Sequence, residues 1–101
     1  MTIDSTYCDK KRLFSISAGS SFDFSNVAKF KTACENLPIE AEHIELDMNN
    51  VRHIDSTALG MMLLMRELVR ERNLTINIIN THKSVNDALN MAHFNRLFNI
   101  A

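Results

Sequence analysis

Apolar and polar residues alternate in three separate segments of the chain, 13–17, 43–48 and 74–79. Alternation points successive side chains to opposite faces, so each segment predicts a strand with one buried face and one face in water. A weaker strand is predicted near residues 2–7, where it can form a hairpin with the strand over 13–17. The chain therefore offers three clear strands and a weaker fourth one.

Helical spacing of apolar residues replaces this alternation in three other segments. The first helix is predicted over 25–37, where Ser25 can cap the start and a proline ends the pattern. The longest helix is predicted over 56–72, and a third, over 84–92, opens with a capping signature at Ser84. The side chains of the longest helix that we expect to face inward are those of Leu59, Met62, Leu63 and Leu68.

The predicted elements follow one another as strand, strand, helix, strand, helix, strand, helix. Strand–helix–strand units favour parallel strands joined by right-handed crossovers, and alternation within the strands favours helices on one face of the sheet. We therefore predict an α/β fold with a mixed sheet of four or five strands and helices mainly on one face. The chain has 101 residues, the usual size of one domain, so we expect a single domain over residues 1–101.

Charge and composition exclude several classes of protein. The net charge is −1 and the basic residues are scattered, so we expect no nucleic-acid partner. No apolar stretch is long enough to span a membrane, and the first residues lack the regions of a signal peptide. Cys8 and Cys34 are predicted to be reduced thiols, with Cys34 in the core. These features indicate a cytoplasmic protein.

The motifs of common catalytic and cofactor sites are missing from the sequence. It contains no G-x-S-x-G, no glycine-rich phosphate loop, no H-E-x-x-H and no C-x-x-C. The four histidines lack the spacing of metal ligands and are interpreted as surface or loop residues. Asp47 ends a predicted strand but lacks the acidic pair and lysine of a receiver domain, so we interpret it as a polar strand-end residue. We therefore predict no metal, no cofactor and no enzymatic activity.

The most informative segment is 51–60, which joins a strand to the longest helix. Asp55, Ser56 and Thr57 lie together where that helix begins. Either Asp55 or Ser56 can cap the helix, which by itself contributes about 1 kcal/mol. Gly60 costs a helix interior about 1 kcal/mol relative to alanine, which suggests a close approach by backbone or by a partner.

Three methionines, Met61, Met62 and Met65, follow that glycine closely. Methionine fills irregular gaps in cores, and it also lines surfaces that accept different partners. Residue usage favours the core for these three, although a binding surface stays open at this point.

Residues 54–60 read Ile-Asp-Ser-Thr-Ala-Leu-Gly, a run that resembles the signature of STAS domains in bacterial anti-sigma-factor antagonists. The resemblance covers nearly the whole chain and includes residues 22–24, 44–47 and 94–100. One departure is a shorter loop over residues 18–21, which leaves its contacts open.

This resemblance implies a switch controlled by phosphorylation. In that family the serine after the aspartate is phosphorylated by a partner kinase, often the anti-sigma factor itself, and a serine phosphatase reverses the reaction. By position the acceptor is Ser56, and the kinase is of the histidine-kinase-like ATPase type. We expect a monomer that binds this kinase when unphosphorylated and regulates transcription or a bacterial behaviour such as surface attachment. The residues expected to bind the partner are Arg52, His53, Asp55, Ser56, Thr57, Ala58 and Gly60.

Two other interpretations come from different classes. STAS-like domains also serve as subunits of lipid or anion transport systems, where the hydroxyl residues cap the helix and the domain docks an ATPase. A hydrolase that uses Ser56 as its nucleophile is disfavoured, because no histidine lies in a motif that would activate the hydroxyl.

Overall fold

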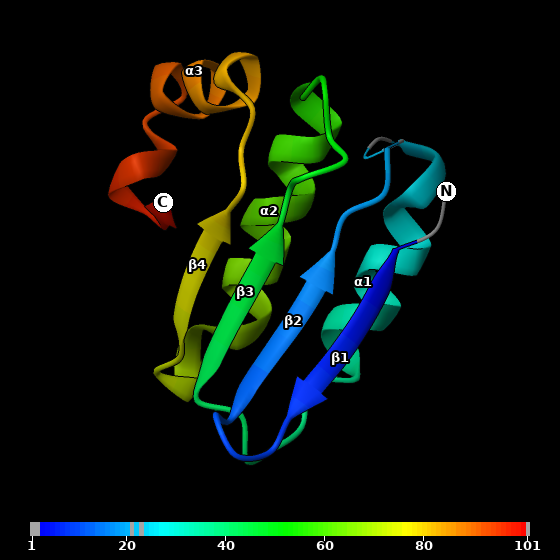
Figure 1. Ribbon diagram of the computed structural model, residues 1–101, viewed down its shortest axis with the longest axis vertical. Helices are drawn as coiled ribbons and strands as arrows, with labels where there is room; N and C mark the ends of the chain where they lie inside the picture. The colour runs from blue at the N-terminus through cyan, green and yellow to red at the C-terminus, as the bar shows by residue number, and fades with distance from the viewer. Residues whose placement is uncertain (1–2, 21, 23, 101) are drawn as a thin grey trace.

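The computed structural model describes residues 3–20, 22 and 24–100, and Figure 1 shows how their elements are arranged. The strands are β1 (Asp4–Cys8), β2 (Leu13–Ser17), β3 (His43–Asp47), β4 (Thr75–Ile79) and β5 (Asn99–Ile100). The helices are α1 (Val27–Glu35), α2 (Ser56–Val69) and α3 (Lys83–Met91), with short 3₁₀ turns η1 (Phe24–Asn26), η2 (Arg70–Arg72) and η3 (Phe94–Arg96). The predicted order of strands and helices is confirmed from β1 to α3, and β5 follows as a short strand that this order did not contain.

The strands form one sheet in the order β1-β2-β3-β4-β5. β1 and β2 are antiparallel, which confirms the predicted hairpin, and every later neighbouring pair is parallel. The register aligns Ile16, Leu46 and Ile78 across three neighbouring strands, and all three side chains are buried. The prediction of a mixed α/β sheet of four or five strands is confirmed.

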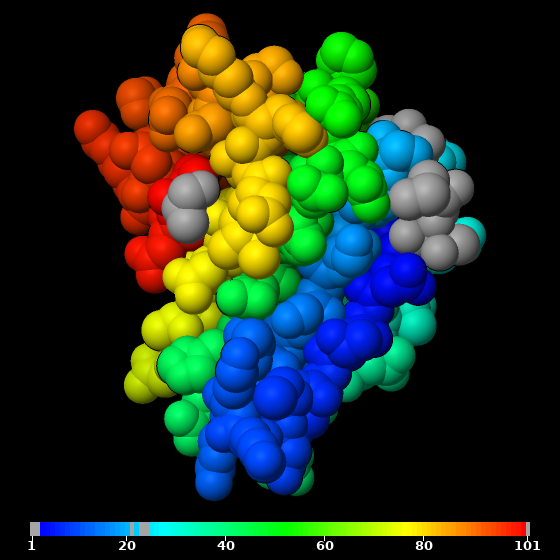
Figure 2. Space-filling view, in the orientation of Figure 1, coloured from blue at the N-terminus to red at the C-terminus, as the bar shows by residue number. Residues whose placement is uncertain are grey.

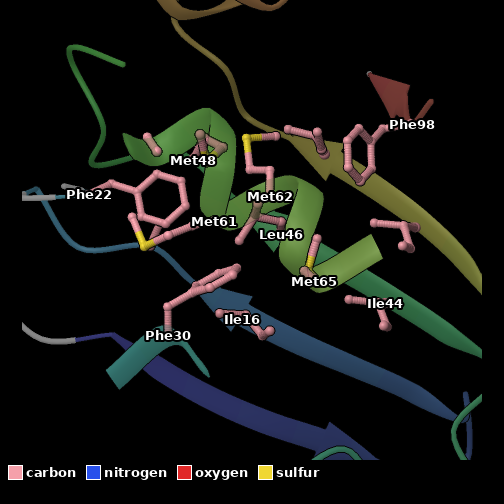
Figure 3. Packing of buried hydrophobic residues seen from close by; sticks show 14 of the residues in the cluster. Ile16, Phe22, Phe30, Ile44, Leu46, Met48, Met61, Met62, Met65 and Phe98 are labelled. Atoms are coloured by element: carbon pink, nitrogen blue, oxygen red, sulfur yellow. The ribbon is translucent and has the colours of Figure 1, made fainter. Parts of the chain in front are cut away.

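The two faces of the sheet have different environments. In Figure 1, α1 and α2 lie behind the sheet, while α3 lies beyond the end where β4 finishes. Every second residue of β2, β3 and β4 is buried, and the residues between them are exposed or half-buried. Figure 3 shows the buried side chains packed between α2 and the strands. The prediction of helices mainly on one face is therefore confirmed.

The buried face of α2 differs from the prediction. Leu63 and Leu68 were expected to face inward, but their side chains are 43% and 44% exposed. The buried residues of the helix are Ala58, Met61, Met62, Met65 and Val69. Residues 58–65 are apolar almost all round the helix, so helical spacing alone allows two neighbouring stripes. Packing against the sheet buries the side of the helix that carries Met61, Met62 and Met65.

The start of α1 and the end of α2 also differ from the prediction. Ser25 does not cap α1, because it lies inside the turn η1 and α1 begins only at Val27, with Asn26 in the N-cap position. The helix predicted to reach residue 72 ends at Val69 and continues as the turn η2. Asn73 then adopts a left-handed conformation with φ of 57°, which ends the helical path before β4.

Candidate functional site

The start of α2 is capped by Asp55. Its backbone is extended, with φ of −118° and ψ of −178°, and its Oδ1 accepts a 2.8 Å hydrogen bond from the backbone N–H of Ala58. The backbone carbonyl of Asp55 accepts the first bond of the helix, from the N–H of Leu59 at 3.0 Å. Of the two candidate caps in the sequence, Asp55 is the one that the structure uses.

Replacing Asp55 by alanine should lower the free energy of unfolding by about 1 kcal/mol, because the N–H of Ala58 loses its side-chain acceptor. Replacement by serine keeps an oxygen at the N-cap and should cost much less. Urea denaturation of both variants measures the difference. Equal midpoints for the alanine and serine variants would contradict a stabilising role for this cap.

Ser56 is the first residue of α2 and is exposed. In the part of the chain that the structure describes, its hydroxyl takes part in no hydrogen bond, because the capping bond is made by the neighbouring carboxylate. The next residue, Thr57, is half-buried. The N-terminus of a helix carries a partial positive charge that favours an anionic group. A phosphate can thus be added to Ser56 without breaking an intramolecular hydrogen bond.

The loop before α2 is held to the end of the sheet by Asp47. Its Oδ1 accepts hydrogen bonds from the backbone N–H of Asn49 at 2.9 Å and from the side-chain amide of Asn80 at 3.2 Å. Val51 anchors the middle of the loop in the core, with 0% of its surface exposed. The interpretation of Asp47 as a polar strand-end residue agrees with these contacts.

Residues at the start of α3 fix the other side of the same loop. His82 bridges it, with Nε2 at 2.6 Å from the carbonyl of Asn49 and Nδ1 at 3.4 Å from Nη1 of Arg52. A carbonyl only accepts and a guanidinium only donates, so these contacts fit the neutral ring with its proton on Nε2. The Ser84 hydroxyl donates to the carbonyl of Arg52 at 3.1 Å.

Ser84 was expected to cap the third helix, and this prediction is wrong. α3 begins one residue earlier, at Lys83, with His82 in the N-cap position. The hydroxyl of Ser84 is used for the contact with the loop instead. Neither His82 nor Ser84 was predicted as part of the site, because both contacts join residues thirty or more positions apart. No local sequence pattern could have found them.

The structure brings most of the predicted partner-binding residues to one end of the molecule, where the loop after β3 lies near α3 (Figure 1 and Figure 2). Arg52, His53, Asp55, Ser56 and Gly60 are exposed there. By contrast, Ala58 is fully buried. Its side chain therefore cannot touch a partner, and its small size serves the packing of α2 on the sheet.

Gly60 faces open space on the surface of α2. A Cβ added at this position would meet no atom within 4 Å, so the close approach by the chain's own backbone that the sequence suggested does not occur. The approach of a partner is the remaining functional explanation for this residue. The methionines that follow give no support to a binding surface, since Met61, Met62 and Met65 are all buried in the core (Figure 3).

Other kinds of site find little support. The described residues contain no group of three or more His, Cys, Asp or Glu side chains placed to hold a metal ion. Cys34 is buried as predicted, and burial raises the pKa of its thiol to about 12, which keeps the sulfur protonated and unreactive. None of the described helices is both long and apolar enough to cross a membrane.

Comparison with known proteins connects this site to a family. The pattern that defines the STAS domain matches residues 9–101 of this chain. A STAS-domain containing protein of Pseudomonas aeruginosa (strain UCBPP-PA14) is 34% identical over 80 residues, which cover 79% of each of the two chains.

Solved structures share the fold at low sequence identity. An anti-sigma-factor antagonist (STAS) domain protein from Planctomyces limnophilus superposes with a TM-score of 0.80 at 12% identity, covering 99% of this chain and 89% of that one. A variant of RsbS from Moorella thermoacetica gives 0.77 at 11% identity, with 100% and 86% covered. A sulfate transporter family protein from Wolinella succinogenes gives 0.76 at 17% identity, with 85% and 70% covered.

The resemblance seen in the sequence is thus confirmed by a family pattern over nearly the whole length and by a shared fold. This chain belongs to the STAS domain family, whose members are typically non-catalytic regulatory domains.

Proposed function

We propose that this protein is an anti-sigma-factor antagonist that works as a protein-binding switch, with Ser56 as the residue whose phosphorylation turns binding off. Two neighbouring residues at the start of α2 have separate roles, and this observation carries the proposal. Asp55 caps the helix, which leaves the adjacent Ser56 hydroxyl exposed and without a structural hydrogen bond. A modification at Ser56 therefore acts on the surface and leaves the fold intact.

The physical effect of the phosphate is a local change of charge. A phosphoserine carries about −1.5 to −2 charges at neutral pH, and the helix dipole stabilises an anion at this position by roughly 0.3–1 kcal/mol. The domain therefore stays folded. A partner docked over the helix start meets the new charge beside the carboxylate of Asp55, and repulsion and desolvation weaken the complex.

The proposed partners follow from this scheme. An anti-sigma factor that is also a serine kinase of the histidine-kinase-like ATPase type binds the unphosphorylated surface and transfers phosphate from ATP to Ser56. A serine phosphatase restores the binding-competent form. The proposed docking surface comprises the loop over 49–53 and the exposed side of the first turns of α2, with Asp55, Ser56 and Gly60 exposed at its centre.

A second candidate is a STAS subunit of a transport system that docks an ATPase. The similar fold of the sulfate transporter family protein from Wolinella succinogenes favours it. Under this candidate the surface around Ser56 is a permanent contact, and no change of phosphorylation state accompanies binding.

Co-purification from the host organism separates the two candidates. Ser56→Ala cannot be phosphorylated, so as bait it should retain its partner persistently. We expect mass spectrometry of the retained proteins to identify a histidine-kinase-like ATPase. Recovery of a transporter ATPase by both the parent and the variant would overturn the switch and favour the second candidate.

Gly60 gives a separate test of the docking surface. Gly60→Ala should raise the free energy of unfolding by up to about 1 kcal/mol, because the added Cβ meets no other atom and alanine favours the helix. Gly60→Gln keeps most of that gain, yet its longer side chain should obstruct the partner and weaken binding about tenfold, a loss of roughly 1.4 kcal/mol. Titration of both variants against the purified partner would show the contrast. Parent-like affinity of Gly60→Gln would place Gly60 outside the interface.

A further inference from the structure

A cavity of about 370 Å³ lies at the opposite end of α2 from Ser56. Its wall is formed by the last turn of α2, the first residues of β4 and the segment that joins η3 to β5. α2 runs along the back of the sheet in Figure 1, and a rise of 1.5 Å per residue separates Ser56 from this end by about 15–20 Å. The cavity is therefore distinct from the proposed switch.

The charge around this cavity is unbalanced. Arg66 lines it from α2, Arg70 from η2 and Arg96 from η3, whereas none of its described lining residues is acidic. Arg70, the first residue after α2, follows Arg66 by four positions along the continuing helical path, a spacing at which like charges repel. Three full positive charges thus border one hollow.

Existing ion pairs leave most of this charge uncompensated. Arg70 lies 3.6 Å from Glu67, but both side chains are 64% exposed, and an exposed pair of this kind is weak. In the described part of the chain, Arg66 and Arg96 form no ion pair. Two of the three guanidinium groups are therefore available to an anion from outside.

A purely structural reason accounts for only part of this arrangement. Cationic side chains near the C-terminus of a helix interact favourably with its dipole, which explains Arg66 in the last turn of α2 and Arg70 at its C-cap. The dipole of α2 does not explain Arg96. This residue belongs to η3, which follows β4 and α3 along the chain, and it lines the same cavity. Asn73, Asn95 and Asn99 also line the hollow, and asparagine is a residue type that can donate hydrogen bonds without adding charge.

We propose that this cavity binds a small polyanion through its phosphate or carboxylate groups. Guanidinium groups donate paired hydrogen bonds that match the oxygens of both groups. The volume of about 370 Å³ falls within the range of roughly 300–1,000 Å³ that is usual for small-molecule sites. The ligand would bind at the far end of α2 whether or not Ser56 is phosphorylated.

Isothermal titration with two probes, pyrophosphate and citrate at equal ionic strength, tests this site and separates phosphate from carboxylate as the preferred group. We expect saturable one-to-one binding of at least one probe. Arg66→Gln and Arg96→Gln should each weaken it about tenfold or more, since each removes one guanidinium from the wall. Lys31→Gln removes the same charge from an exposed position on α1 and should leave the affinity within about twofold.

Far-UV circular dichroism of the arginine variants verifies that they remain folded, which their exposed or half-buried side chains predict. The absence of saturable binding by both probes would overturn the proposal. An equal loss of affinity in Lys31→Gln would do the same, because it would show attraction to overall charge and not to this cavity.

Discussion

Ser56→Asp should lower the affinity for the kinase-type partner by tenfold or more, a loss of at least about 1.4 kcal/mol, without lowering the melting temperature. The aspartate places a permanent charge beside Asp55 in the proposed docking surface. The same charge lies at the first position of α2, where the helix dipole favours it. Affinity and stability should therefore change in different directions.

Ser56→Asn is the matched control, because asparagine has the shape of aspartate without its charge. We expect it to bind within a few-fold of the parent, so that the difference between the two variants measures charge alone. Ser56→Ala should be close to neutral for stability, since Asp55 supplies the cap. If the aspartate variant bound as tightly as the parent, Ser56 would not control binding. If asparagine weakened binding as much as aspartate, the size of the side chain and not its charge would cause the loss.

Met65→Ala should lower the free energy of unfolding by about 2–5 kcal/mol, because its side chain is fully buried between α2 and the sheet and its removal leaves a cavity. Figure 3 shows this residue among the side chains of the core. A loss of this size is a large part of the stability of a small domain. Urea denaturation followed by circular dichroism measures it.

Leu63→Ala serves as the comparison, since it removes an apolar side chain of similar size from the same helix. Its side chain is 43% exposed, so we expect a loss of about 1 kcal/mol or less. The sequence predicts that Leu63 faces inward as well, so it predicts no such difference between the two residues. If Leu63→Ala were the more damaging variant, α2 would be rotated relative to the structure described here.

The strands were predicted well because their signal is local. Residues 13–17 and 43–48 alternate with a period of two, and a strand with one buried face produces that pattern directly. The same alternation predicted the one-sided helical layer. For α2 the pattern was insufficient, because residues 58–65 are apolar on several sides, and only contact with the sheet decides which side is buried.

The candidate site was predicted less completely than the strands. The run over residues 54–60 indicated the helix start and the family, and it left Asp55 and Ser56 as equal candidates for the cap. The choice depends on backbone geometry that no residue type encodes. The contacts of His82 and Ser84 with the loop depend on the packing of α3 beside it, and such pairings between distant residues are set by the fold as a whole.

The central claim is that the bound partner phosphorylates Ser56 and is thereby released. Its most direct test is intact-mass spectrometry of the purified complex before and after addition of ATP, with peptide mapping of the modified residue. We predict that the protein becomes heavier by one phosphate, that the phosphate maps to Ser56 and that the partner dissociates. An unchanged mass, or a phosphate on another residue, would contradict this account of the protein.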